Sequence, residues 1–147
     1  EQANQLADAL RRSNNNNNGA IESFDFHDDT LTPVTLQPLW NILLDSGVPK
    51  ISFGNSFTAD PPIDYSNNNI DFAGMETNKS LKEFNLIGYS MREEDYGNLF
   101  NSMKVNKGLE RLKLNYYTYT HLPTRMKKLF EEMLSENITL LDCRLYG

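Results

Sequence analysis

A histidine among three carboxylates is the first feature of the sequence whose residue types could do chemistry. Asp25, His27, Asp28 and Asp29 lie next to one another, and His121 is far away in the sequence. Such side chains bind zinc or act as an acid and base pair. No second His-Asp pair is present. A short acidic run after a strand is typical of a solvated loop, so we predict neither a metal site nor a catalytic site here.

Other signatures of catalysis are also weak. Cys143, the single cysteine, occupies an apolar position of a strand pattern, which predicts a buried thiol and not a nucleophile. Gly88, Gly97 and Gly108 are isolated, so the sequence has no glycine-rich phosphate loop, and it has no Gly-x-Ser-x-Gly elbow. We therefore expect a chain that is not an enzyme and that holds no cofactor.

Length and charge limit the class of protein. The chain has 147 residues and a formal net charge of −6, which predicts a single domain over residues 1–147. An acidic chain is a poor partner for nucleic acid or for an anionic membrane, because both attract a dense basic surface. No apolar run approaches the roughly 18 residues of a membrane span. One cysteine fits a reducing compartment, so we predict a cytoplasmic, intracellular protein.

Five copies of one pattern organise the chain. The pattern is Asn, two residues, apolar, two residues, apolar, one residue, apolar. Clear copies start at Asn78, Asn106 and Asn137, and degenerate copies start at Asn18 and Asp45. These anchors, at 18, 45, 78, 106 and 137, are about thirty residues apart, which is the spacing of a repeat protein.

Each copy predicts a helix followed by a strand. The last apolar positions alternate with polar ones, as in a half-buried strand. Helical spacing precedes the anchors at residues 93–105 and 124–136, with shorter stretches at 38–44 and 3–10 and the weakest at 64–75. Since Asn tolerates the left-handed backbone conformation, we expect each anchor Asn to close its helix in that conformation.

The pattern resembles the leucine-rich repeat, and a full helix per unit is similar to the ribonuclease-inhibitor-like class, which includes tropomodulins and Ran GTPase-activating proteins. The resemblance implies an α/β fold: a curved solenoid of about five helix-strand units with a parallel sheet on its concave face and helices on its convex face. The family often places Asn or Cys three residues after the last strand leucine. Here these positions hold Asp29, Ser56, Tyr89 and Tyr117, which predicts irregular loops in place of a regular Asn ladder.

The ends of such a solenoid are apolar unless an atypical repeat covers them. The sequence shows no obvious polar cap at either end. We therefore expect either a fragment of a longer protein or self-association through uncapped ends.

Polar positions that alternate with the buried strand residues should lie on the concave face. Residues 1–77 hold eleven acidic and three basic side chains, whereas residues 78–147 hold nine acidic and eleven basic ones. Tyrosines follow the fourth strand, where they either anchor a partner or fill gaps between loops. The candidate partner-binding residues of this face and its loops are Glu83, Asn85, Arg111, Lys113, Asn115, Tyr117, Tyr119, Asp142, Arg144 and Tyr146.

The function predicted from these features is that of a non-catalytic scaffold that binds another protein through its concave face. The family resemblance leaves two alternatives open. One is a small-GTPase regulator or GTPase-activating-like accessory domain, which would direct Arg111, Arg144 or Asn115 at a phosphate. The other is a bacterial effector repeat domain that acts on a host protein. A structural self-assembly segment is a further possibility, because fold alone does not fix the partner.

Overall fold

A single parallel sheet runs through the molecule. The structure is a computed structural model that describes residues 2–15, 21–27, 33–54, 70–87, 93–115 and 122–146. Its five strands follow one another in the order of the sequence, and every neighbouring pair is parallel. The strands are β1 (Phe24–His27), β2 (Lys50–Gly54), β3 (Glu83–Ile87), β4 (Arg111–Asn115) and β5 (Asp142–Tyr146).

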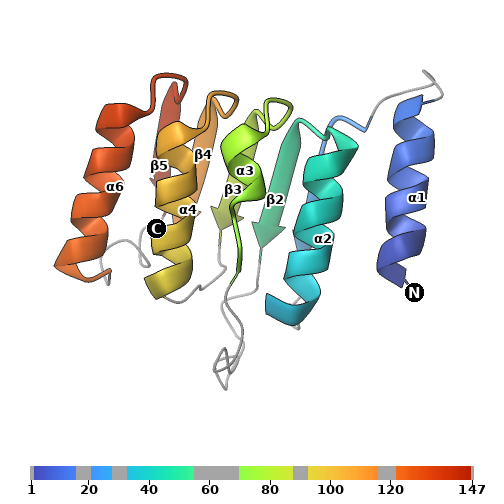
Figure 1. Cartoon of the computed structure of the whole chain (residues 1–147), viewed down its shortest axis with the longest axis horizontal. Coiled ribbons are helices and arrows are strands. Elements are labelled where there is room, and N and C mark those ends of the chain that lie inside the picture. Colours follow the sequence, from blue (N-terminus) through green and yellow to red (C-terminus); the bar gives the residue numbers. More distant parts are fainter. Residues whose placement is uncertain are drawn as a thin grey trace.

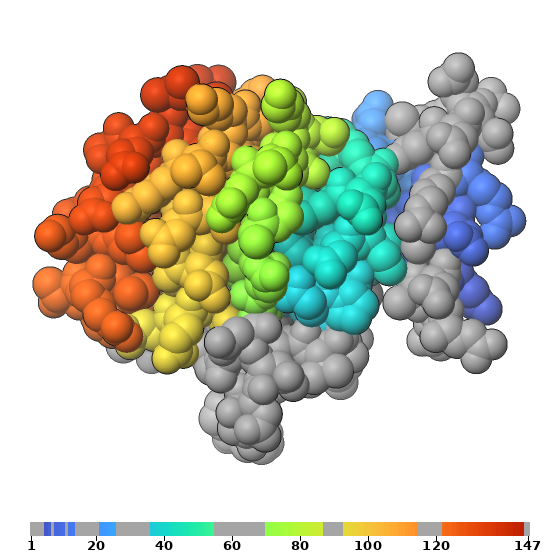
Figure 2. All heavy atoms as spheres, in the orientation of Figure 1, coloured from blue at the N-terminus to red at the C-terminus, as the bar shows by residue number. Residues whose placement is uncertain are grey.

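Helices form a second layer on one face of this sheet (Figure 1). They are α1 (Gln2–Asn15), α2 (Pro33–Ser46), α3 (Gly74–Thr77), α4 (Glu93–Val105) and α6 (Thr124–Glu136). In the space-filling view, α2, α3, α4 and α6 lie as successive bands, each beside its sequence neighbours (Figure 2). The predicted curved α/β solenoid of about five helix-strand units is thus confirmed. None of the helices in the described ranges is long and apolar enough to cross a membrane.

Strand pairing places the repeat anchors in register. The first core-facing position of each strand pairs with its counterpart in the next strand, so that one row, buried on β2, β3 and β4 and partly buried on β1 and β5, crosses the whole sheet. This row is Phe24, Ile51, Phe84, Leu112 and Cys143. Each of these residues stands six positions after its anchor. The five-fold period found in the sequence is therefore the period of the sheet.

The core lies between the sheet and the helices. Around α2 it is built from four aromatic rings, of which Trp40 and Phe84 have centroids 4.8 Å apart. Phe72 meets Trp40 edge-on at 5.5 Å, and Phe53 meets Phe84 edge-on at 6.1 Å. All four side chains are almost completely buried. Such rings bury large apolar areas and fix the distance between helix layer and sheet.

The third helix is much shorter than its neighbours. The sequence favoured a helix over residues 64–75, of which residues 64–69 lie outside the described residues; in the described part, residues 70–73 are not assigned to a helix and α3 begins at Gly74. The main-chain N–H of Ile70 donates to Asp95 at 2.8 Å, and that of Asp71 donates to Gln37 at 2.6 Å. Because side chains of α4 and α2 take these donors, the segment is held extended between the two helices.

The anchor asparagines do not adopt the expected left-handed conformation. Asn78 has φ −69° and ψ 126°, and Asn137 has φ −76° and ψ 118°, both extended. Among the described glycines the left-handed backbone occurs at Gly47, with φ 76°, directly after α2. That helix runs one residue past the degenerate anchor Asp45, and glycine makes the turn there without steric cost. The other degenerate anchor, Asn18, lies outside the described residues.

The side chains of these asparagines form a regular ladder instead. The Asn106 side-chain Nδ2 donates to the main-chain oxygens of Met75 (2.5 Å) and Asn78 (2.9 Å), in the previous unit. Its Oδ1 accepts the main-chain N–H groups of Gly108 (2.9 Å) and Leu109 (2.7 Å). The prediction of irregular loops concerned the positions after the strands, Asp29, Ser56, Tyr89 and Tyr117, which lie outside the described residues. The anchor ladder lies before the strands.

Candidate functional site: the concave face of the sheet

Two polar rows cross the face of the sheet that lies opposite the helices. We call the first the Glu83 row and the second the Asn85 row. The Glu83 row consists of Lys50, Glu83, Arg111 and Asp142. The Asn85 row consists of Asp25, Ser52, Asn85, Lys113 and Arg144. Neighbours in a row are one strand spacing apart, about 4.8 Å. The strand alternation seen in the sequence therefore predicted this face correctly.

Glu83 is the centre of the charged network. Its Oε2 accepts from Arg111 Nε at 3.0 Å, and its Oε1 accepts from Lys113 Nζ at 2.8 Å. Lys50 Nζ lies 3.7 Å from the same Oε1. With three cations around it, the Glu83 side chain is only 9% exposed. Three strands are thus joined by one carboxylate.

Asn85 extends this network into the second row. Its Nδ2 donates to Glu83 Oε1 at 3.1 Å and to Ser52 Oγ at 2.9 Å. Its Oδ1 has no hydrogen-bond donor within the described part of the chain. Asn85 and Ser52 are both buried even though they stand on the open face, because the longer charged side chains pack over them.

The ion pairs set the protonation state of Glu83. Burial of the carboxylate raises its pKa, but the hydrogen bonds from Lys113 and Asn85 and the charges of Lys113 and Lys50 outweigh burial. The net effect lowers the pKa of Glu83 to about 2. Glu83 therefore carries its negative charge throughout the physiological pH range.

Cations dominate the exposed layer of this face. Arg144 Nε donates to Asp142 Oδ2 at 2.7 Å within β5, and the Arg144 side chain is 60% exposed. The Arg111 side chain is 50% exposed. Glu83 lies beneath its cations, and Asp142 is less exposed than its partner Arg144. The rows hold four basic and three acidic side chains, of which Asp25 is exposed on β1. The part of the face over β3 to β5 therefore presents mainly basic groups to solvent, in a chain whose net charge is −6.

The structure brings together six of the ten candidate residues: Glu83, Asn85, Arg111, Lys113, Asp142 and Arg144. The candidate set omitted Lys50 and Ser52, although the repeat register places both in the same rows. Asn115 and Tyr146 are paired at the ends of β4 and β5, and only their backbone is described. Tyr117 and Tyr119 lie outside the described residues, so their role stays a prediction.

The other candidate chemistry of the sequence does not form a site in the described residues. Asp25 is exposed on β1 and pairs in register with Ser52, whereas Asp28 and Asp29 lie outside the described ranges. In the ranges that are described, no group of three or more His, Cys, Asp or Glu side chains could hold a metal ion. Cys143 is partly buried against the core. Burial and then the charge of Asp142 raise the pKa of its thiol to about 11.

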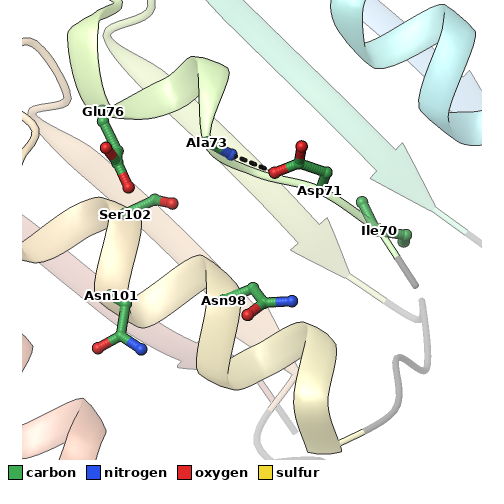
Figure 3. Close-up of a pocket in the computed structure, with 7 residues that line it drawn as sticks. All are labelled: Ile70, Asp71, Ala73, Glu76, Asn98, Asn101 and Ser102. Carbon is green, nitrogen blue, oxygen red and sulfur yellow. Dashed lines mark hydrogen bonds between the residues drawn. The ribbon is translucent and has the colours of Figure 1, made fainter.

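A hollow of about 240 Å³ opens on the opposite, convex face between α3 and α4. It exists because α3 is a single turn beside the much longer α4 (Figure 3). Its lining includes Glu76, Asn98 and Asn101. The carboxylate of Asp71 accepts the main-chain N–H of Ala73 at 2.8 Å, so it caps the local turn. The hollow is open and polar, and the side chains that line it do not form the binding site of any particular kind of ligand.

Comparisons with known proteins identify the fold. No protein-family model matches the sequence, and no curated protein matches it. The C-terminal domain of tropomodulin from Caenorhabditis elegans superposes with a TM-score of 0.63 and 14% identity, covering 100% of this chain and 84% of that chain. Leiomodin-1 actin-binding site 2 superposes with a TM-score of 0.64 and 19% identity, covering 95% and 78%. The chain therefore has the tropomodulin-like leucine-rich-repeat fold that its sequence pattern indicated.

Proposed function

We propose that this chain is a non-catalytic protein-interaction module that binds a partner protein through the concave face. The network around Glu83 is the observation that carries the proposal. It fixes Arg111 and Lys113 at defined positions on a rigid sheet, while the sides of these residues that face solvent stay accessible. A surface arranged before binding loses less conformational entropy when a partner arrives.

The structural neighbours support a protein partner. One of them is an actin-binding site of leiomodin-1. At 19% identity this likeness shows the fold, so actin is a candidate partner for this chain and is tested directly. We also propose an intracellular location, because the single cysteine of the sequence fits a reducing compartment.

The GTPase-regulator alternative has less support. It requires Arg111 or Arg144 to be directed at a nucleotide phosphate, whereas the two structural neighbours described above are a tropomodulin domain and an actin-binding site of leiomodin-1. Turnover of GTP by a panel of small GTPases, measured with and without this chain, tests it. We expect no acceleration, and a reproducible acceleration that requires Arg111 would replace the proposal.

The binding test compares two variants with the same change in net charge. The concave variant is Arg111→Glu/Lys113→Glu/Arg144→Glu, and the control variant is Lys79→Glu/Lys107→Glu/Lys128→Glu, whose lysines are exposed outside the two rows. Each immobilised chain is offered purified actin and, separately, a cell extract whose captured proteins are quantified. We expect the concave variant alone to lose specific partners. Equal capture by the parent and both variants would show that the concave face is not the binding site.

Self-association through the solenoid ends stays a separate prediction. Ile138 and Leu141, in the last unit, are each 80% exposed. Exposed apolar side chains of this size favour association when they are contiguous. Sedimentation over a range of concentrations measures it, and a constant monomer mass would contradict it.

A further inference from the structure

Glu83 and the arginines of the two polar rows differ in depth as well as in charge. The carboxylate of Glu83 lies at the bottom of the face, whereas the guanidinium groups of Arg111 and Arg144 reach solvent. A partner that approaches this face meets basic groups first. We propose that the concave face binds an acidic segment of the partner protein, with Asp or Glu carboxylates placed against Arg111, Lys113 and Arg144. This inference rests on the proposed function and names the chemistry of its partner.

Glu83 prepares the basic groups for this contact. It holds Arg111 through Nε and Lys113 through Nζ, which orders two long side chains before binding. A guanidinium group has five N–H donors in a planar fork, so a group that is held through Nε still presents a wide edge to an incoming carboxylate. Because half of the Arg111 side chain is exposed, this edge is accessible from solvent.

The spacing of the basic groups suits a polypeptide. Arg111 and Lys113 are two residues apart on β4, which corresponds to about 6.6 Å along a strand. Alternate side chains of an extended peptide have the same separation. Lys113 and Arg144 are direct neighbours across β4 and β5, about 4.8 Å apart. Carboxylates at alternate positions of an extended segment can therefore contact Arg111 and Lys113 along β4. Neighbouring groups of the same segment then reach Arg144 on β5.

Nucleic acid fits the same face poorly. Tight binding of a phosphate backbone needs a long array of basic groups that displaces several counterions. The two rows hold only four basic side chains, three acidic side chains accompany them, and the chain has a net charge of −6. A short acidic segment needs only local neutralisation, so charge complementarity favours a peptide.

The test measures binding of fluorescent peptides to the full chain by anisotropy. The probes are a peptide of alternating Glu and Ser, its Gln-Ser and Lys-Ser counterparts, and a single-stranded RNA oligonucleotide. We expect the Glu-Ser peptide to bind the parent at least tenfold more tightly than the other three probes, with an affinity that falls as salt rises. In Arg111→Glu/Arg144→Glu this preference should be lost, whereas Lys107→Glu/Lys128→Glu should stay within twofold of the parent.

Three outcomes would overturn the inference. The first is equal binding of the Glu-Ser and Gln-Ser peptides, the second is preferred binding of the Lys-Ser peptide or of RNA, and the third is an equal loss in the control variant. These outcomes concern the peptide measurements alone. The proposed function would still be supported if partner capture required the concave face. If the double variant does not fold, as judged by circular dichroism, the milder Arg144→Gln serves, and it should weaken Glu-Ser binding severalfold.

Discussion

The side-chain Nδ2 of Asn137 lies 3.1 Å from the main-chain oxygen of Asn106, the residue at the equivalent position one repeat earlier. Asn106 makes the same contact with Asn78, at 2.9 Å. Each anchor also reaches the helix end of the previous unit, since Asn137 Nδ2 donates to the Met103 oxygen at 2.6 Å. Main-chain groups at the ends of successive helices are thus satisfied by the side chain of the next unit, and the ladder links each unit to the one before it.

Replacing Asn106 by alanine should strongly destabilise the fold. The change removes the partner of the Asn78 carbonyl and of the N–H groups of Gly108 and Leu109, whereas the Met75 carbonyl keeps only the main-chain N–H of Asn78, at 3.2 Å. Each unsatisfied buried group is costly, so we expect a loss of about 2–4 kcal/mol in the free energy of unfolding, measured in urea. Asn98→Ala, at an exposed position of α4, is the matched control. A similar loss in both variants would contradict a special role for the ladder.

Gly108 should be intolerant of any side chain. A Cβ atom there would lie 2.7 Å from the main-chain oxygen of Asn78 and 2.7 Å from the Cα of Lys79. Backbone atoms cannot move aside cheaply, so we expect Gly108→Ala to lower the free energy of unfolding by about 1–3 kcal/mol.

Gly97 provides the comparison for that substitution. It is also buried, but a Cβ atom would meet only side chains at ordinary contact distances, Met126 at 3.5 Å and Leu129 at 3.9 Å. Within α4, alanine is a better helix former than glycine by up to about 1 kcal/mol. Gly97→Ala should therefore be neutral or stabilising in the same urea titration. Equal destabilisation of both variants would show that close approach at Gly108 is not the cause.

The sequence predicted the repeat well because strand periodicity and anchor spacing are both local signals. The boundaries expected for the helices at 93–105 and 124–136 agree with α4 and α6. The role of the anchor asparagines was not predictable in the same way. Their role depends on the stacking of each unit on the preceding one, since the acceptors of Asn106 lie 28 and 31 residues earlier.

In the candidate site, too, some features follow from the local sequence and others from the pairing of neighbouring strands. The alternation in β4 placed Arg111 and Lys113 on one face, which the structure confirms. Their convergence on Glu83 depends on the pairing of β3 with β4, and the burial of Glu83 depends on Lys50 of β2 as well. Periodicity along one strand says nothing about which charges meet across three strands, so the network could not be read from it.

Cys143 should react slowly with alkylating agents in the folded chain. Burial and the neighbouring Asp142 raise the pKa of its thiol to about 11, from an ordinary value of 9.0. At a pH below both values, a shift of two units lowers the thiolate fraction about a hundredfold. We expect iodoacetamide labelling at pH 8 to be slower by about this factor than in denaturant. Asp142→Asn should restore only a small part of the rate, because burial is the larger cause.

Glu83→Gln should make the free energy of unfolding less dependent on pH in the acid range. The folded-state pKa of Glu83 is about 2, below its ordinary value of 4.5. A lowered pKa stabilises the folded state fully above pH 4.5, and this contribution is lost as the pH falls from 4.5 toward 2. A shift of this size corresponds to at most about 3 kcal/mol, and screening by solvent reduces it to about 1–2 kcal/mol.

Urea titrations of the parent and of Glu83→Gln at pH 7 and at pH 3 measure this contribution. The parent should be more stable by about 1–2 kcal/mol at pH 7. The difference should shrink at pH 3, because there the unfolded chain binds a proton at Glu83 while the folded chain keeps this carboxylate mostly ionised. Glu110→Gln is the control, since Glu110 is more exposed and pairs with Lys82 at 3.4 Å, a contact that we expect to contribute less than about 1 kcal/mol. If the difference in free energy of unfolding between the parent and Glu83→Gln were the same at both pH values, Glu83 would stabilise the fold by packing and not by its charge.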